Sequence, residues 1–220
     1  MVYIKSIGLI CNYGIDNFDY GPAVGSASYR YGVNDYLTLE GHAEGAEALA
    51  LGGMGSLVKL GRLGVVNGAW TESRMRGNSG NQMNWGYQYS TAEFSVATQH
   101  SRRERGFGNL ALYDQTPLVD NDNQPLASLS QRSDQYSLTF NMGEFGNVGA
   151  AWIGIRSFDS QKTELLNLSW SRNLWGSSSL YLSASRDNQQ GDWTLAMSVQ
   201  IPLGERDSAA LSMEKTPDAG

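Results

Sequence analysis

Two carboxylates and one histidine alternate in a short stretch of the sequence, and by residue type they could bind a metal ion or move protons. Glu40, His42 and Glu44 take every second position of "LEGHAEG", and histidine nitrogens and carboxylate oxygens are common zinc ligands. On a β-strand, however, residues two apart share a face and lie roughly 6.5 to 7 Å apart. Three neighbours on one strand do not converge on one ion without a partner strand, so we favour a row of polar side chains over a metal site.

The rest of the sequence offers no motif for catalysis or cofactor binding. His42 and His100 are the only histidines, and neither belongs to a recognisable nucleophile motif. Cys11 is the only cysteine, so the chain cannot form an internal disulfide or a cysteine-based zinc site. We therefore expect no catalytic residue, no cofactor, no metal site and no enzymatic activity.

Alternating apolar and polar side chains predict the strands that position these residues. In "DQYSLTFNMG", Tyr136, Leu138 and Phe140 alternate with Ser137 and Thr139, which a strand separates onto two faces and a helix scatters. The same period of two recurs in "GDWTLAMSVQIPLG", where the apolar set is Trp193, Leu195, Met197, Val199 and Ile201 and the polar set includes Thr194, Ser198 and Gln200.

Composition and turn signals extend this pattern to the whole chain. The 26 glycines and the charged share of only 17% suit short strands joined by tight turns, because glycine supplies the backbone angles that turns require. Turn-forming stretches such as "LGRLG" and "GEFGN" separate the alternating runs. We predict an all-β chain of about twelve strands in an antiparallel up-and-down order, with one polar excursion at about residues 101–133.

The charge distribution bears on partners. The net charge of −6 argues against nucleic-acid binding, which needs a clustered basic surface. The one basic run, Arg102, Arg103 and Arg105, includes Glu104, and we interpret it as a solvated loop.

The alternation allows two architectures. In a soluble sandwich or propeller the apolar face points into a core, whereas in an outer-membrane barrel it points to lipid and the polar face lines the lumen. Aromatic residues near the ends of the runs favour the barrel, because aromatic girdles lie at the boundary between water and lipid: Tyr29, Tyr31, Tyr36, Trp175 and Trp193. A soluble all-β binding protein or carbohydrate-active protein remains the alternative.

The order of the motifs resembles a known family. "DYGPAVGSASYRYGVNDYLTLEGHAEG" followed by "ALGGMGSLVKLGRLGVVNGAWTESR", and later "QYSLTFNMGEFGNVGAAWIGIRSF" and "WTLAMSVQIPLGERDSAALSME", resemble the barrel domain of fimbrial outer-membrane ushers of the chaperone–usher pathway. The resemblance covers nearly all of residues 1–220 and corresponds to the middle to later part of that barrel, after the plug insertion.

This resemblance implies a transmembrane barrel segment in the bacterial outer membrane, which serves as a pore and assembly platform for pilus subunits. It implies pilus subunits, a periplasmic chaperone and outer-membrane lipid as partners of the intact usher, and no nucleic acid. The chaperone-recruiting, plug and C-terminal domains of ushers have no counterpart in the sequence, so we expect a fragment of an usher. On this interpretation the lumen is lined by Thr38, Glu40, His42, Glu44, Thr194 and Ser198, whereas Leu37 and Leu39 face lipid.

Overall fold

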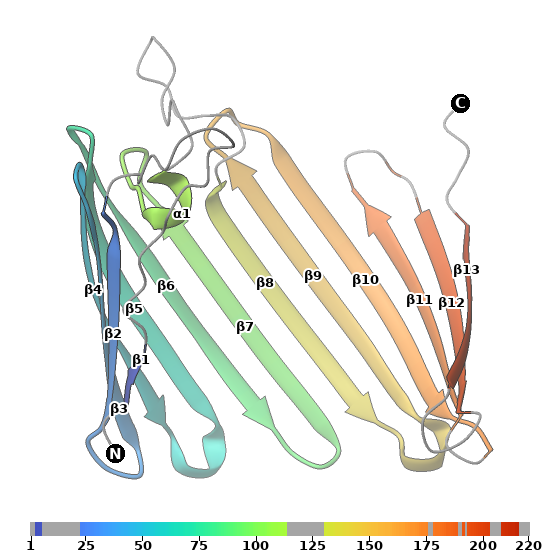
Figure 1. The fold of residues 1–220 in the computed structure, drawn as a ribbon. Helices are drawn as coiled ribbons and strands as arrows, with labels where there is room; N and C mark the ends of the chain where they lie inside the picture. The colour runs from blue at the N-terminus through green and yellow to red at the C-terminus, as the bar shows by residue number, and fades with distance from the viewer. Residues whose placement is uncertain are drawn as a thin grey trace. The chain divides into compact units, whose positions relative to one another are not determined.

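A computed structural model describes residues 3–5, 23–113, 130–175, 178–188, 191, 193–202 and 208–215. In this part of the chain thirteen strands form one sheet, and each strand lies beside its neighbour in the sequence (Figure 1). This confirms the predicted all-β, up-and-down antiparallel fold. The count is close to the expected twelve, since β1 has only three residues.

The strands are mostly eight to thirteen residues long. They are β1 (Tyr3–Lys5), β2 (Gly25–Gly32), β3 (Leu37–Ala46), β4 (Leu49–Lys59), β5 (Val65–Met75), β6 (Asn78–Ser90), β7 (Phe94–Arg103), β8 (Ser130–Asn141), β9 (Asn147–Ser157), β10 (Lys162–Asn173), β11 (Ser179–Asp187), β12 (Trp193–Pro202) and β13 (Ser208–Lys215). Among the described residues, three short helical turns interrupt them: η1 (Gly61–Leu63), α1 (Leu110–Tyr113) and η2 (Gly143–Phe145).

Two of the predicted turns use the same local chemistry. "GRLG" and "GEFG" each form a single 3₁₀ turn between two strands, and a glycine with positive φ stands at either end. Gly61 and Gly64 have φ of 63° and 101°, and Gly143 and Gly146 have φ of 61° and 89°. A side chain at these angles would be strained, which explains the glycine at both positions of each turn.

The excursion between β7 and β8 is shorter than the sequence suggested. β7 continues to Arg103 and β8 begins at Ser130, so the connection runs from residue 104 to residue 129, of which 104–113 are described. The interpretation of the basic run as a solvated loop is wrong for Arg102 and Arg103, which belong to strand β7.

The chain divides into two compact units, which are described separately below. Unit 1 comprises residues 1–87, 100–132 and 156–161, and unit 2 comprises residues 88–99, 133–155 and 162–220. The buried apolar cluster of the described residues lies in unit 1, where the connection after β7 packs against β4 and β5. None of the described helices is long and apolar enough to cross a membrane.

Candidate functional site

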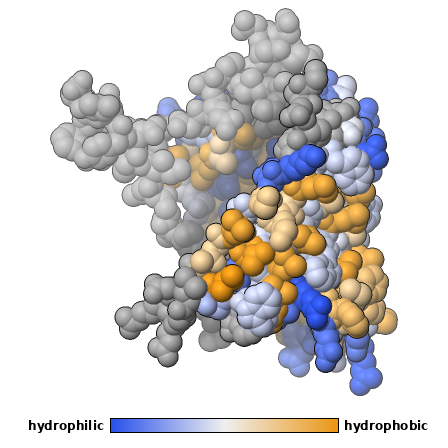
Figure 2. Space-filling view, turned by 90° about the vertical axis from the view of Figure 1, so that its right-hand side faces the viewer, coloured by the Kyte–Doolittle hydropathy of each residue, from blue (hydrophilic) through white to orange (hydrophobic). Residues whose placement is uncertain are grey.

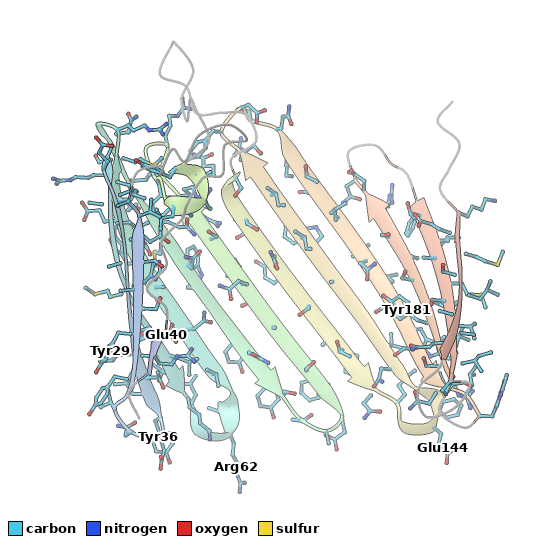
Figure 3. The ribbon with its side chains drawn as sticks, viewed as in Figure 1. Tyr29, Tyr36, Glu40, Arg62, Glu144 and Tyr181 are labelled. Atoms are coloured by element: carbon cyan, nitrogen blue, oxygen red, sulfur yellow. The ribbon has the colours of Figure 1, made fainter. Side chains whose placement is uncertain are left out.

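Strands β2 and β3 place the predicted polar row on one side of unit 1. Their antiparallel register pairs Ser28 with His42 and Arg30 with Glu40. Because side chains on a strand alternate, Tyr29 points to the opposite side (Figure 3). We call the side that carries Ser28, Arg30, Glu40, His42 and Glu44 the polar face, and the side that carries Tyr29 the apolar face.

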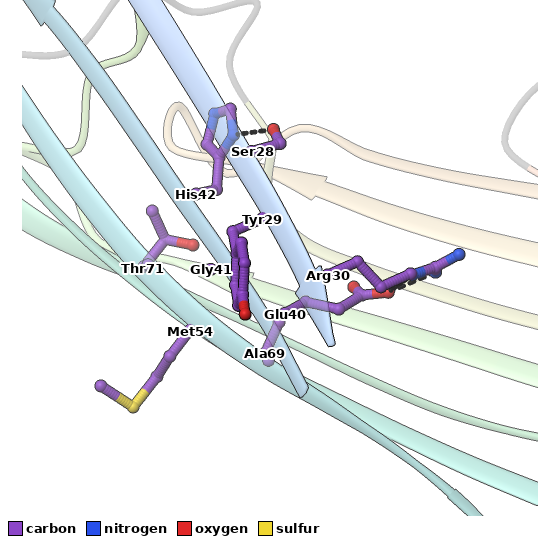
Figure 4. A pocket seen from close by; sticks show the side chains of 11 residues that line it. Ser28, Tyr29, Arg30, Glu40, Gly41, His42, Met54, Ala69 and Thr71 are labelled. Carbon is purple, nitrogen blue, oxygen red and sulfur yellow. Dashed lines mark hydrogen bonds and ion pairs between the residues drawn. The ribbon is translucent and has the colours of Figure 1, made fainter. Parts of the chain in front are cut away.

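The polar side chains form two adjacent networks rather than one cluster (Figure 4). The two ring nitrogens of His42 lie 2.7 Å from Ser28 Oγ and 2.8 Å from Glu44 Oε1. The Arg30 guanidinium pairs with the Glu40 carboxylate. Four of them, Ser28, Arg30, Glu40 and His42, border a hollow of about 460 Å³ that extends to Thr71 of β5.

The two networks engage Glu40, His42 and Glu44 with different partners. Glu40 turns to Arg30 on β2, whereas Glu44 turns to His42 on its own strand. Within the described ranges, no group of three or more histidine, cysteine, aspartate or glutamate side chains could hold a metal ion. The arrangement is that of a hydrogen-bonded polar surface.

Residues 104–113 return from the end of β7 and pack on this polar face; we call them the docking segment. The other carboxylate oxygen of Glu44, Oε2, accepts the backbone N–H of Leu110 at 2.7 Å. Ser73 of β5, only 1% exposed, accepts the backbone N–H of Gly108 through its Oγ at 2.9 Å. The two side chains thus satisfy backbone donors that would otherwise be left without partners.

An apolar cluster fixes the docking segment on the sheet. Phe107 and Leu112 of the segment pack against Leu49, Leu51 and Met75, which are between 1% and 6% exposed. The register pairs Leu49 with Met75, and both stand on the polar face because they continue the alternation of Glu44 and Ser73. The polar face thus carries a buried apolar patch where the docking segment covers it.

Glycines let the segment approach the sheet at backbone distance. A Cβ on Gly80 of β6 would touch the backbone nitrogen of Phe107, and one on Gly106 would touch the carbonyl oxygen of Ser79. At the far end of the segment, Arg76 donates to the carbonyl oxygen of Tyr113 at 2.7 Å. Its guanidinium carbon also lies 5.4 Å from the centre of the Tyr113 ring.

Large apolar side chains stand exposed on the opposite face of unit 1. Tyr29 is 46% exposed, Met54 75% and Trp70 46%. Leu39 joins them on this face, since it alternates with Glu40, and is 44% exposed. The part of unit 1 that the structure describes thus has its packed segment on the polar face and its bare hydrophobic surface on the other.

Unit 2 shows the same division on β10 to β13. The register brings Leu182 opposite Met197, and Met197 opposite Met213, on one face. The other face carries polar residues, among them the predicted pair Thr194 and Ser198, opposite Ser185 and Tyr181. Leu195, Met197, Leu211 and Met213 are between 41% and 66% exposed. In the space-filling view of this side, hydrophobic residues gather in the middle and hydrophilic ones toward the ends (Figure 2).

Adjacent glycines of β4 show that the two faces of unit 1 differ in available space. A Cβ on Gly53, on the polar face, would lie 2.7 Å from Thr71 Oγ1, and one on Gly55 would lie 3.2 Å from the Cβ of Ala69. A Cβ on Gly52 or Gly68, on the apolar face, would meet nothing within 4 Å. Side chains converge on the inside of a curved sheet, so the polar face of this part of unit 1 is concave.

The structure places all six predicted residues on polar faces, but it does not bring them together. Thr38, Glu40, His42 and Glu44 share the polar face of β3 in unit 1, and Thr194 and Ser198 belong to unit 2. Sequence reasoning missed the partners Ser28, Arg30 and Ser73 and the docking segment. The one available signal was "RGFG" after β7, because closely spaced glycines permit a close backbone approach.

The strand order and the division into two faces define the class of architecture: an antiparallel up-and-down sheet with one polar and one apolar side. No family model and no curated protein matches the sequence. Among solved structures, the chain is similar to the translocation pore of the P pilus usher PapC, at 21% identity and a TM-score of 0.67, over 99% of this chain and 45% of that one.

Two further usher structures agree. An Escherichia coli P pilus tip assembly intermediate, PapC-PapD-PapK-PapG, matches over 99% of this chain and 28% of that one, at 21% identity and a TM-score of 0.73. A crystal structure of the PapC pore matches over 98% and 44%, at 19% identity and a TM-score of 0.62. The chain spans less than half the length of the usher chains that it matches, and its fold is that of part of their barrel.

Proposed function

We propose that this chain forms part of the wall of an outer-membrane usher pore, through which pilus subunits pass during fimbrial assembly. The observation that carries the proposal is the division of each unit into a polar and an exposed apolar face, on strands that follow the course of the PapC barrel. An outer-membrane barrel requires this alternation, because one face meets lipid and the other meets water.

On this proposal Thr38, Glu40, His42 and Glu44 in unit 1, and Thr194 and Ser198 in unit 2, line the lumen. The hydrogen-bonded pairs on β2 and β3 give this surface polar groups that can exchange contacts with water. A folded subunit can slide past such a surface, because its contacts exchange with water and no large apolar patch holds it.

The apolar faces meet lipid. Met54 and Leu211, at 75% and 66% exposed, need a hydrophobic solvent or a partner. Tyr36 and Trp175 lie in turns at the ends of strands and are 59% and 73% exposed, which suits the aromatic girdle of a membrane barrel.

The alternative of a soluble sandwich is less well supported. In a sandwich a second layer packs on the apolar face of the sheet. In unit 1 the described layer, the docking segment, packs instead on the face that carries Glu44 and Ser73. We therefore do not favour a soluble binding protein or a carbohydrate-active protein.

The partners follow from the usher resemblance. One matched structure is an assembly intermediate that contains PapC together with PapD, PapK and PapG. We assign pilus subunits and a periplasmic chaperone as partners of the pore to which this chain contributes strands, and transport in place of catalysis as its activity. In this assignment residues 1–220 supply strands of the barrel.

Cysteine labelling along one strand tests the faces. With Cys11 replaced by serine, single cysteines at Leu195 or Val199 of β12 should react with lipid-phase reagents in outer membranes. Cysteines at Thr194 or Ser198, one residue away, should react with water-soluble maleimide. Within each adjacent pair, 194 with 195 and 198 with 199, the two sites share a strand and a similar depth, so they control for each other. Reversed labelling would refute the pore wall.

Crosslinking tests the transport step separately. A photo-crosslinker at Ser198 should capture a pilus subunit in cells that make the matching chaperone and subunit, because a subunit in transit passes the lumen. The same group at Leu195 should capture lipid and no subunit. Correct labelling without a subunit crosslink would leave a membrane barrel and reject the usher activity.

A further inference from the structure

Three arginines gather at one end of neighbouring strands in unit 1. Arg102 stands near the end of β7, Arg132 near the start of β8, and Arg156 near the end of β9. These strands are neighbours and run in alternating directions, so the three positions lie side by side at the same end of the strands (Figure 1). All three side chains line a single hollow of about 390 Å³.

The charge of this hollow is opposite to that of the whole chain. The charged side chains on its side of the sheet are Arg102, Arg132 and Arg156, with Glu104 as the one acidic residue of the lining. The Glu104 carboxylate is engaged with the backbone, since its Oε2 accepts the N–H of Asn81 at 3.1 Å. The lining therefore carries more basic than acidic residues, in a chain of net charge −6.

The hollow opens on the apolar face. The Arg102 guanidinium carbon lies 5.2 Å from the centre of the Trp85 ring, and Trp85 stacks on His100 at 5.3 Å. The side chain of Arg103, the next residue, lies on the polar face, where it donates to Gln82 Oε1 at 3.1 Å and lies over Phe107. The lining also includes Trp70 and Met83, which are 46% and 44% exposed.

The hollow combines guanidinium groups with exposed apolar and aromatic side chains, and it lies at the ends of the strands. An anionic lipid has the complementary chemistry, because its charged headgroup lies beside its apolar chains at the membrane boundary. Guanidinium groups bind phosphate oxygens through paired, charge-assisted hydrogen bonds. The side chains of Met83 and Trp70 offer apolar contacts of the kind that acyl chains make. Basic pockets at this depth in membrane proteins hold anionic headgroups.

We propose that Arg102, Arg132 and Arg156 bind the phosphate of an anionic lipid headgroup at the rim of the sheet. The proposal rests on the proposed function, because it needs the apolar face to meet lipid. On this proposal one lipid molecule is a specific ligand of unit 1, in addition to the lipids that surround its apolar face.

Lipid retention tests the proposal. The full chain, reconstituted in vesicles of phosphatidylcholine with a minor share of phosphatidic acid and then extracted in mild detergent, should retain phosphatidic acid preferentially in native mass spectrometry. Replacing one arginine, as in Arg156→Gln, should weaken retention about tenfold, the effect of losing one charge-assisted hydrogen bond. Arg62→Gln, in the turn η1 at the other end of unit 1, is the matched control and should have no effect (Figure 3).

The outcomes separate this proposal from the proposed function. Equal retention of the two lipids by the unmodified chain would overturn the phosphate site, while correct labelling at Leu195 would leave the pore wall intact. Reversed labelling at Leu195 would overturn both. Displacement of the lipid by millimolar inorganic phosphate would show a site for free phosphate and would also contradict the proposal, because a lipid site gains affinity from its apolar contacts. Loss of lipid in the Arg62→Gln variant would show a nonspecific charge effect.

Discussion

Gly80 on β6 and Phe107 in the docking segment meet backbone to backbone, at a separation that leaves no room for a Cβ on the glycine. The two residues are 27 positions apart in the sequence. It holds the docking segment against the polar face together with the hydrogen bond from Gly108 to Ser73.

Gly80→Ala should therefore loosen the docking segment. We expect a loss of about 1 to 3 kcal/mol in the free energy of unfolding, the usual cost of overpacking. Hydrogen exchange at the amides of Gly108 and Leu110 should become faster. Gly68→Ala is the control, because a Cβ there meets nothing within 4 Å. Equal exchange in the two variants would show that the close contact does not hold the segment.

Glu44 should matter more than Glu40, although both belong to the polar row of β3. Glu44 accepts a backbone N–H and contacts His42, and its side chain is 16% exposed. Glu40 pairs with Arg30 where both side chains are well exposed, and such pairs contribute at most about 1 kcal/mol.

Glu44→Gln should cost about 1 to 3 kcal/mol of unfolding free energy and speed exchange at Leu110, because a charge-assisted hydrogen bond is weakened. Glu40→Gln should cost less than about 1 kcal/mol and leave that amide protected. Urea titration of the refolded chain, followed by tryptophan fluorescence, measures both. A larger loss for Glu40→Gln would contradict the assignment of Glu44 as the anchor.

Arginine scanning on β8 should report the two faces of unit 2. Leu138→Arg on the apolar face should destabilise the membrane-inserted chain by roughly 2 to 4 kcal/mol, the cost of a cation near the bilayer midplane. Thr139→Arg, on the polar face with Ser169 and Gly149, should cost much less. Folding titrations into lipid vesicles measure the difference, and equal costs would indicate that lipid does not cover the apolar face.

The adjacent glycines of β4 should respond differently to the same change. Gly53→Ala forces Thr71 to move, whereas Gly52→Ala enters open space. We expect Gly53→Ala to lower the urea midpoint and Gly52→Ala to leave it unchanged or raise it slightly, since alanine restricts the unfolded chain. The opposite order would show that the polar face is not the concave one.

The alternation in the sequence was sufficient to predict the strands and their faces, because a period of two depends only on neighbouring residues. Leu195 and Thr194, or Leu39 and Glu40, fall on opposite faces as expected. That the polar residues line a lumen stays a prediction.

Contacts between distant residues could not be predicted in the same way. Gly108 bonds to Ser73 across 35 positions, and Leu110 bonds to Glu44 across 66. Arg102 was assigned to a loop because its neighbours are charged, yet it continues β7 and stacks over Trp85. Its side chain is stabilised by a partner on another strand, which the local composition does not reveal.

The glycines of β4 differ in the space available for a side chain, and this difference suggests how the curvature of the sheet can be changed by design. A sheet with little space on one side and ample space on the other can bend in only one direction, and the bend is tightest where the inner side chains are smallest. Larger residues at Gly53 and Gly55 would force β4 and β5 to splay, which flattens the arc. In a synthetic pore built from strands of this kind, the size of the residues on the inner face would therefore set the pore diameter.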